Sequence, residues 1–488
     1  MNYGQQKAQK IVTRIGFRCM AAMAAIFSLQ AQHAPPSPER PWDQVSTPAP
    51  LQTIQRGLSK ELPLSATEVY TLPQLIDLAE QHNPETRAAW LAAKAQASQL
   101  GVAKSELYPT LAASAMAQTV ETGVLFGPEF VKQILGLAQE GFELHYTIFD
   151  FGARQDRVAR ERAGLLAANF GFNDTHRRII FAVMMSYYQL LNASGQRSAA
   201  EIDLQNAKAV EEAAEARLAN GLATLPDVLE ARSLTAQAEY DLQQTVGAEE
   251  IASGDLATTL TASPESVIHV QSIESLTIPD HLPELPHELI TEALKNRPDL
   301  QGRLADIQGA EASVREARSA FYPTLKFDGS WDYLRAYGIQ PPYAGAYATS
   351  PVYNAQLNLS WTVFDGWRRE NELARAKSVV KEKQAQAESA EDEISNEVWR
   401  SYSNAKTALR QRQAASSLLN ASNASYNAAL ESYNSGVRNI LDVLSAQRVL
   451  AQARSADITA RARVLSSFAD LSYRTGDLLQ RQRAKKNP

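Results

Sequence analysis

The sequence of 488 residues has almost no cysteine: Cys19 is the single thiol of the chain. One cysteine excludes an internal disulfide framework and any metal site that needs several thiolates. The seven histidines show no metal-ligand spacing, and neither a Gly-Lys-Ser/Thr phosphate loop nor a Gly-x-Ser-x-Gly nucleophile motif occurs. These absences predict a protein that has no catalytic residues, binds no metal or cofactor and is not an enzyme.

An excess of positive charge is also missing. The chain has 48 Lys and Arg against 54 Asp and Glu, which gives a net charge of −6 at pH 7. A nucleic-acid-binding domain usually carries a clustered basic surface, and no basic patch of that kind occurs in the sequence. The composition therefore predicts no nucleic acid among the partners.

Long apolar runs are rare, and one of them lies near the N-terminus, at residues 19–29. It is shorter than the roughly 20 residues that a membrane-spanning helix needs. The basic residues that precede it are Lys7, Lys10, Arg14 and Arg18. Such a segment is typical of a secretory signal peptide, which we expect over residues 1–31, with cleavage after Ala31 or Ala34. We interpret Cys19 as part of its apolar core, without a lipid anchor.

Two proline-rich stretches divide the rest of the chain. Residues 32–71 are predicted to be an extended arm, and residues 263–287 a linker at the equator of the molecule. Between and after them lie two repeats, at 72–262 and 288–476, followed by a short basic tail at 477–488. The repeats share a Tyr-Pro-Thr-Leu segment at 108–111 and 322–325, and a helix break that reads Asn-Pro-Glu at 83–85 and Arg-Pro-Asp at 297–299.

Each repeat also contains a glycine that is followed six residues later by Asp-Val-Leu. The two glycines, Gly221 and Gly436, interrupt long helical patterns, and each is predicted to be a left-handed C-cap between two helices. We expect helices over about 153–219 and 225–262 in the first repeat, and over about 366–434 and 439–475 in the second. The intervening tip turns, at 219–225 and 434–440, place Asp227 and Asp442 in the first turn of the next helix, where an acid is favourable.

Alternating apolar and polar residues predict four strands, at about 110–120, 140–150, 324–334 and 353–364, with loops over 121–139 and 335–353. Their length fits transmembrane β-strands with a wet interior, although a soluble sheet with one buried face would show the same alternation. Aromatic residues at the helix-proximal ends are expected to form an interfacial belt. They are Tyr108, Phe149, Phe151, Tyr322, Trp361, Phe364 and Trp367. Four strands cannot close a barrel in lipid, so this interpretation requires an oligomer.

Taken in this order and found twice, the motifs resemble those of the TolC-like outer-membrane efflux family, over about residues 70–476. The resemblance implies an α+β membrane protein: a homotrimer with a twelve-stranded β-barrel, four strands per chain, continued by a long α-helical barrel across the periplasm. It also implies an exit duct in the outer membrane. Such a duct passively conducts substrate delivered by a periplasmic adaptor and an inner-membrane pump.

The resemblance assigns roles to residues near the tips as well. Asp442 is similar to an acid that lines the periplasmic constriction, while Arg438 and Tyr433 resemble residues that tie one helix pair to the other, with Asp227 as the partner. Ser445 departs from the pattern, because some members carry a second acid there, which implies a weaker anionic ring. Adaptor contact is expected at the tip turns, through Gly221, Leu222, Gly436 and Val437.

Two alternatives remain open on the sequence alone. A type I protein secretion duct would use a similar tunnel, and the sequence names neither the cargo nor the adaptor and pump. A periplasmic coiled-coil scaffold would explain the long Ala-, Glu- and Gln-rich helices, but it does not explain the four amphipathic strands.

Overall fold

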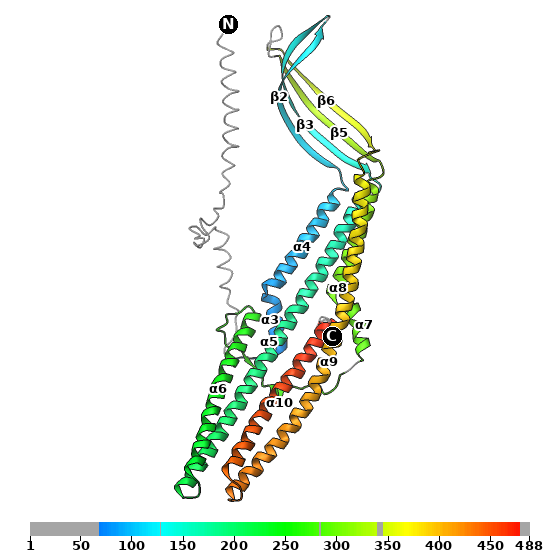
Figure 1. Ribbon diagram of the computed structural model, residues 1–488. Helices are drawn as coiled ribbons and strands as arrows, with labels where there is room; N and C mark the ends of the chain where they lie inside the picture. Colours follow the sequence, from blue (N-terminus) through cyan, green and yellow to red (C-terminus); the bar gives the residue numbers. More distant parts are fainter. Residues whose placement is uncertain (1–67, 127, 283–284, 339–344, 479–488) are drawn as a thin grey trace, which may run out of the picture. The chain divides into compact units, whose positions relative to one another are not determined.

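The computed structural model describes residues 68–126, 128–282, 285–338 and 345–478. Within this part of the chain, a four-stranded sheet adjoins one end of a set of long helices, whose other ends form two hairpin tips (Figure 1). The expected signal peptide and most of the proline-rich arm lie outside the described residues, as does the tail after residue 478.

Two long helices, one in each repeat, organise the helical part. α5 (Ala153–Ala219) and α9 (Arg368–Asn434) have 67 residues each, or about 100 Å at about 1.5 Å per residue. The shorter helices are α3 (Leu72–His82), α4 (Pro84–Ser105), α6 (Leu225–Thr259), α7 (Pro286–Asn296), α8 (Pro298–Ser319) and α10 (Ile440–Thr475). α4 and α6 pack beside opposite halves of α5, and α8 and α10 do the same along α9 (Figure 1). No described helix combines the length and apolarity needed to cross a membrane.

The sheet is antiparallel and has the strand order β2-β3-β5-β6. Its strands are β2 (Thr110–Phe126), β3 (Glu129–Phe149), β5 (Thr324–Gly338) and β6 (Tyr347–Ser360). The central pair, β3 and β5, joins the two repeats, so β2 and β6 are left as edges. The expected loop over 121–139 is wrong, because β2 and β3 remain paired up to Phe126 and Glu129. The branched and aromatic residues of this segment favour continued pairing.

The register gives the sheet two different faces. On one face lie apolar side chains that are half or more exposed in the single chain; they are Leu111, Phe142, Trp331, Tyr353 and Leu357. The other face is polar and carries Glu143, His145 and Asp328. This separation agrees with the alternation in the sequence, since successive side chains of a strand point to opposite faces.

The two proline-rich stretches are more ordered than expected where the structure describes them. β1 (Val69–Tyr70), at the end of the expected arm, pairs in parallel with β4 (His269–Val270) in the linker. The linker also holds a 3-10 turn, η1 (Ile273–Ser275). Tyr70 and Ile273 are buried with side chains of α3, α5, α6 and α10. This cluster explains the added order, because the apolar side chains of the linker anchor it to the helices.

Candidate functional site

The two tips have the same backbone geometry. Gly221 and Gly436 adopt positive φ angles of 69° and 78°. In the first tip the N–H of Leu222 donates to the carbonyl of Arg217 at 2.8 Å, and in the second the N–H of Val437 donates to that of Ser432 at 2.9 Å. Each glycine N–H also donates to the carbonyl three residues before it, at 2.9 Å in both tips. The two bonds make a Schellman motif, which needs a left-handed residue at the glycine position.

The apolar side chains after these glycines have no cover within the chain. Leu222 is 74% exposed and Val437 is 80% exposed. In a Schellman motif this residue usually packs on the third residue from the helix end, but that position holds Arg217 in one tip and Ser432 in the other. Each tip therefore presents one uncovered apolar side chain.

The expected link between Asp227 and Arg438 does not form within the chain. The Asp227 carboxylate instead accepts hydrogen bonds from the hydroxyl and the N–H of Thr224, at 2.7 and 2.8 Å. Both bonds lower the pKa of Asp227, and the bond from the hydroxyl has the larger effect. Thr224 lies only three residues away and caps the helix, whereas Arg438 would have to be reached across the gap between hairpins. Arg438 is exposed and has no ion-pair partner among the described residues.

A different arginine connects the hairpins near the tips. The Arg217 guanidinium lies 4.1 Å from the centre of the Tyr433 ring and donates to the carbonyl of Asn434 at 3.0 Å. Tyr433 is buried, as the expected tie would require, but its partner is Arg217. Sequence reasoning missed Arg217, whose only signal is its position one turn before Gly221. Farther from the tips, Arg448 of α10 pairs with Glu230 of α6 at 3.0 Å.

The remaining tip residues are open to solvent in the single chain. Asp442 and Ser445 are exposed on α10. The N–H of Asp442 donates to the side chain of Asn439 at 3.1 Å, so Asn439 caps this helix without using the Asp442 carboxylate. The second repeat thus leaves its tip acid free for other contacts, whereas the first repeat uses its acid as a cap.

At the opposite end, each strand meets its long helix at a corner held by a buried ion pair. Asp150 pairs with Arg154 at 2.8 Å, and Asp365 pairs with Arg369 at 2.9 Å. Both arginines also donate to backbone carbonyls of the preceding helix–strand turn, Arg154 to Glu106 and Arg369 to Ala320. These contacts fix the sheet on the helices in the same way in both repeats.

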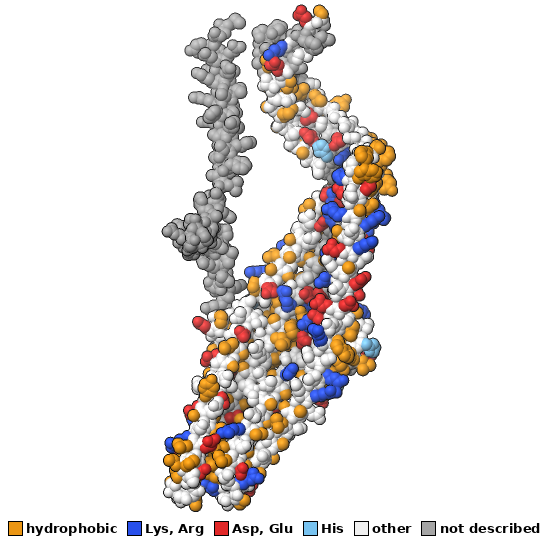
Figure 2. Space-filling model, in the orientation of Figure 1, with side chains coloured by type: hydrophobic (Ala, Val, Ile, Leu, Met, Phe, Trp, Pro, Cys, Tyr) orange, Lys and Arg blue, Asp and Glu red, His pale blue; other side chains and the backbone are white. Residues whose placement is uncertain are grey.

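The seven aromatic residues expected to form a belt gather at these corners, where Figure 2 shows an apolar patch between the sheet and the helices. They are 42% to 71% exposed. Phe151 and Trp367 have positive φ angles of 51° and 66°, a conformation that costs a bulky residue about 1–3 kcal/mol. The backbone of each corner is therefore strained at an aromatic residue that remains exposed.

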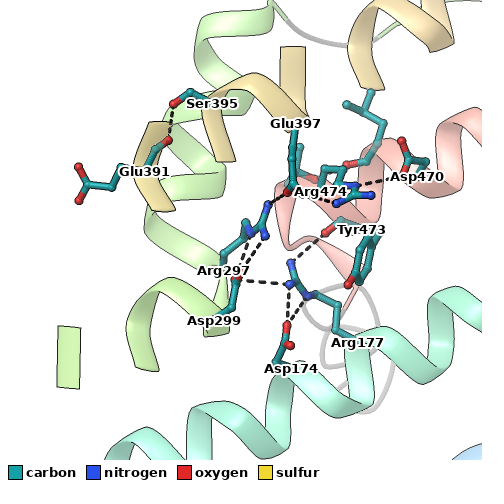
Figure 3. A network of polar contacts seen from close by, with 12 residues as sticks. Asp174, Arg177, Arg297, Asp299, Glu391, Ser395, Glu397, Asp470, Tyr473 and Arg474 are labelled. Carbon is teal, nitrogen blue, oxygen red and sulfur yellow. Dashed lines mark hydrogen bonds and ion pairs between the residues drawn. The ribbon is translucent and has the colours of Figure 1, made fainter. Parts of the chain in front are cut away.

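A charged network joins the repeats midway along the helices (Figure 3). Arg297, at the break between α7 and α8, contacts Asp299 and Glu397 at 2.6 Å each. Arg177 of α5 contacts Asp299 at 3.4 Å and the carbonyl of Tyr473 at 3.1 Å. The side chains of Arg297 and Arg177 are 7% and 2% exposed. Buried cations of this kind need paired acids. Here they are the neighbouring Asp174 and Asp299, and the distant Glu397.

The sequence model of the outer membrane efflux protein family matches residues 75–261 and 289–477, which covers most of both repeats. The chain belongs to this family. The resemblance to TolC-like outer-membrane efflux proteins is thereby confirmed. As a member of the outer membrane efflux protein family, the chain is an exit duct located in the outer membrane.

Individual relatives and a solved structure agree with this assignment. Protein CyaE of Bordetella pertussis is 26% identical over 85% of this chain and 86% of its own. The toluene efflux pump outer membrane protein TtgC of Pseudomonas putida is 24% identical over 89% of this chain and 90% of its own. The outer membrane channel MtrE of Neisseria gonorrhoeae, solved in its open state, shares the fold with a TM-score of 0.69 and 22% identity over 83% of this chain and 88% of its own.

Proposed function

We propose that three copies of this chain form one efflux duct. The observation that carries the proposal is the sheet, which has two open edges, β2 and β6, and an exposed apolar face. Unpaired backbone groups are not tolerated in lipid, and known bacterial barrels have no fewer than about eight strands. Several copies must therefore share one barrel, and three copies supply twelve strands. The helices then continue the barrel as a tunnel in the periplasm.

Native mass spectrometry of detergent-extracted protein tests this assembly. We expect a trimer that stays in the membrane fraction under high-salt washing and leaves it in detergent. A monomer that is released by salt alone would contradict the duct and favour a peripheral helical scaffold.

We propose that the tips form the gate. Three copies would bring three Asp442 carboxylates near one axis, where they repel one another and attract cations. The Arg217 contacts with Tyr433 and Asn434 would hold the two hairpins of each copy together in the closed state. A cation over an aromatic ring contributes about 0.5–2 kcal/mol depending on its exposure.

Single-channel recording in planar bilayers tests this gate. We expect Arg217→Ala to raise the open probability, and Asp442→Asn to weaken block by divalent cations added on the tip side. Arg197→Ala is the matched control, because Arg197 lies on the same helix but pairs with Glu201 and Glu249 of its own repeat. Equal behaviour of Arg217→Ala and this control would exclude the tie as a latch.

We propose that the tips also bind a periplasmic adaptor, which links the duct to an inner-membrane pump. The exposed side chains of Leu222 and Val437 support this role, as does the name of TtgC, an efflux pump protein. We expect the double variant Leu222→Ser/Val437→Ser to reduce co-purification with a periplasmic adaptor protein that binds the wild-type duct. Ile251→Ser removes an apolar side chain of α6 that is 67% exposed and lies away from the tips, and it should leave co-purification unchanged.

We propose that the aromatic residues at the corners contact outer-membrane lipid at the periplasmic interface. Their exposure and their position beside the strands support this role, because aromatic girdles flank the apolar band of membrane barrels. Lipids brominated near the headgroup should quench the fluorescence of Trp361 and Trp367 more strongly than lipids brominated near the chain ends. Equal quenching by both would contradict the interfacial position.

A further inference from the structure

A groove lies between the linker that joins the repeats and the second helical hairpin. The linker forms one wall, α9 and α10 form the other, and the volume is about 720 Å³. The guanidinium of Arg412 on α9 donates to the carbonyl of Pro279 at 3.5 Å and so holds the linker beside the helices. The volume lies within the range of about 300–1,000 Å³ that is usual for small-molecule sites. The charged side chains that line this linker groove are Asp280, Lys406, Arg410, Arg412, Asp457 and Arg461.

Asp457 of α10 brings a buried carboxylate to the linker groove. The residue is 4% exposed. Its Oδ2 accepts a hydrogen bond from Nε of Arg461, one turn farther along α10, at 2.7 Å. Its Oδ1 is buried and has no hydrogen-bond partner among the described residues. Buried polar atoms are nearly always paired, so this oxygen calls for a donor from a molecule in the groove.

The opposite wall supplies positive charges that are free to bind. Lys406 and Arg410 are four residues apart on α9, so they lie on the same face of the helix. Both are exposed, and neither side chain has a partner among the described residues. Arg461 also remains 30% exposed beside Asp457. With four cations and two acids, the linker groove has an excess of positive charge.

We propose that the linker groove binds short acidic peptides that carry a free amino group. The ammonium group donates to Oδ1 of Asp457, and the carboxylates bind Lys406 and Arg410 through charge-assisted hydrogen bonds. A simple anion would leave Oδ1 without a donor. A metal cation would be repelled by the excess of positive charge. A ligand with one ammonium and two carboxylates satisfies both walls and also offsets the net charge.

The neutral side chains of the linker groove suit the rest of a peptide. Gln413, Ser416 and Ser417 of α9 line it as well, and their amide and hydroxyl groups can both donate to and accept from a peptide backbone. Leu282 of the linker and Leu409 of α9 add apolar contacts. The groove therefore offers partners for the backbone and side chains of a peptide, in addition to its charges.

Isothermal titration calorimetry on the detergent-extracted protein tests this site. The probes are the dipeptide glutamyl-alanine, which has one ammonium and two carboxylates, and its N-acetyl form, which lacks the ammonium. We expect wild type to bind the free dipeptide about tenfold more tightly than the acetylated one, because a hydrogen bond between charged groups is lost. This comparison needs no variant, so it does not depend on the folding of any substituted chain.

Two variants assign the contacts. Asp457→Asn should weaken the binding of the free dipeptide about tenfold and leave that of the acetylated form unchanged, since only the free form uses Oδ1. Lys406→Gln/Arg410→Gln should weaken both peptides. Lys377→Gln/Lys381→Gln is the matched control, because it removes two exposed positive charges of the same helix that do not line the linker groove. It should leave both affinities unchanged.

The outcomes distinguish the peptide site from the proposed duct, on which it does not depend. Equal affinity of wild type for the two dipeptides, or no binding of either, would overturn the site even if the protein forms a normal channel. Weakening by Lys377→Gln/Lys381→Gln as strong as that by Lys406→Gln/Arg410→Gln would show attraction by net charge only and would also overturn it. Binding as expected in a protein that forms no channel would support the site and contradict the duct alone.

Discussion

The two repeats interrupt their first helices at equivalent prolines, Pro84 and Pro298, but the residue before each proline makes very different contacts. In the first repeat, Asn83 caps α4 by accepting a hydrogen bond from the N–H of Glu85 at 2.7 Å. The Glu85 side chain then pairs with Arg178, and both side chains are about 60% exposed. In the second repeat, Arg297 occupies the position of Asn83 and is buried among acids from two elements (Figure 3).

A different residue before the proline, Arg297 in place of Asn83, makes the second helix break a point of contact between several helices. Burial opposes the charge on Arg297, but its hydrogen bonds with Asp299 and Glu397 outweigh that effect and raise the pKa of the guanidinium. Glu397 also contacts Arg474 of α10 at 2.6 Å. The second break therefore connects α8, α9, α10 and, through Arg177, α5. An exposed pair such as Glu85–Arg178 contributes only about 0–1 kcal/mol.

The largest effect is expected from Arg297→Ala. Removing one partner of a buried ion network leaves uncompensated charge and costs about 3–5 kcal/mol. We expect the midpoint of thermal unfolding in detergent to fall strongly. Asn83→Ala, at the equivalent position, should cost about 1 kcal/mol as a lost helix cap. Equal losses at the two positions would remove the distinction between the repeats.

The corners should show a smaller asymmetry. Arg154→Ala leaves Asp150 buried without its cation, at a cost of about 3–5 kcal/mol. A backbone N–H donates to the carboxylate in both corners. Arg369→Ala should cost less, because the guanidinium of Arg368 also lies 3.9 Å from Asp365. Thermal unfolding of both variants measures the difference. A greater loss in Arg369→Ala would show that Arg368 does not compensate.

Acid should weaken the second junction in a defined range. Burial raises the pKa of Asp299, but the hydrogen bond and charge of Arg297 outweigh it, and the net pKa is lowered. Its contribution to stability is therefore complete above the unfolded carboxyl pKa of about 3.9 and is lost as pH falls through the lower folded value. We expect Asp299→Asn to unfold at a lower temperature than wild type at neutral pH. As the pH falls through this acid range, its unfolding temperature should fall less than that of wild type. The exposed counterpart, Glu85→Gln, should follow the wild-type acid profile.

The tip caps should give the smallest effects and differ little. Thr224→Ala removes the hydroxyl that donates to Asp227 and keeps the backbone N–H that also donates to it, and Asn439→Ala removes the cap of α10. Each should cost about 1 kcal/mol in thermal unfolding. Only Thr224→Ala weakens the hold on an acid, since Asp227 loses one of its two hydrogen bonds, so only this variant should also change channel block by cations. Block that changes equally in both variants would mean that Asp227 is already free in the assembled duct.

The helices and tip turns could be predicted from short stretches of the sequence. Gly221 and Gly436 mark left-handed helix ends, and α5 and α9 end within one residue of the expected positions. The alternation on β5 and β6 placed their apolar side chains on one face. The lengths of β2 and β3 could not be predicted from alternation in the sequence, because each strand extends as far as it pairs with the other.

The expected contact between Asp227 and Arg438 is not made within the chain for a related reason. Sequence reasoning paired two residues by their matching places in the repeats, but Thr224 is a nearer donor for Asp227. Arg217, Arg177 and Glu397 were not expected as contact residues. Each of them has a partner more than 70 residues away in the chain, which no local pattern predicts, although Arg177 also pairs with Asp174 on its own helix.

The sequence alone therefore determined the repeated plan, the helix ends and the two-faced strands, because backbone preferences and side-chain periodicity act over a few neighbouring residues. Only the tertiary structure decided which charges meet and which tip acid is used as a cap. Those outcomes depend on distances between elements that pack together only after the chain has folded.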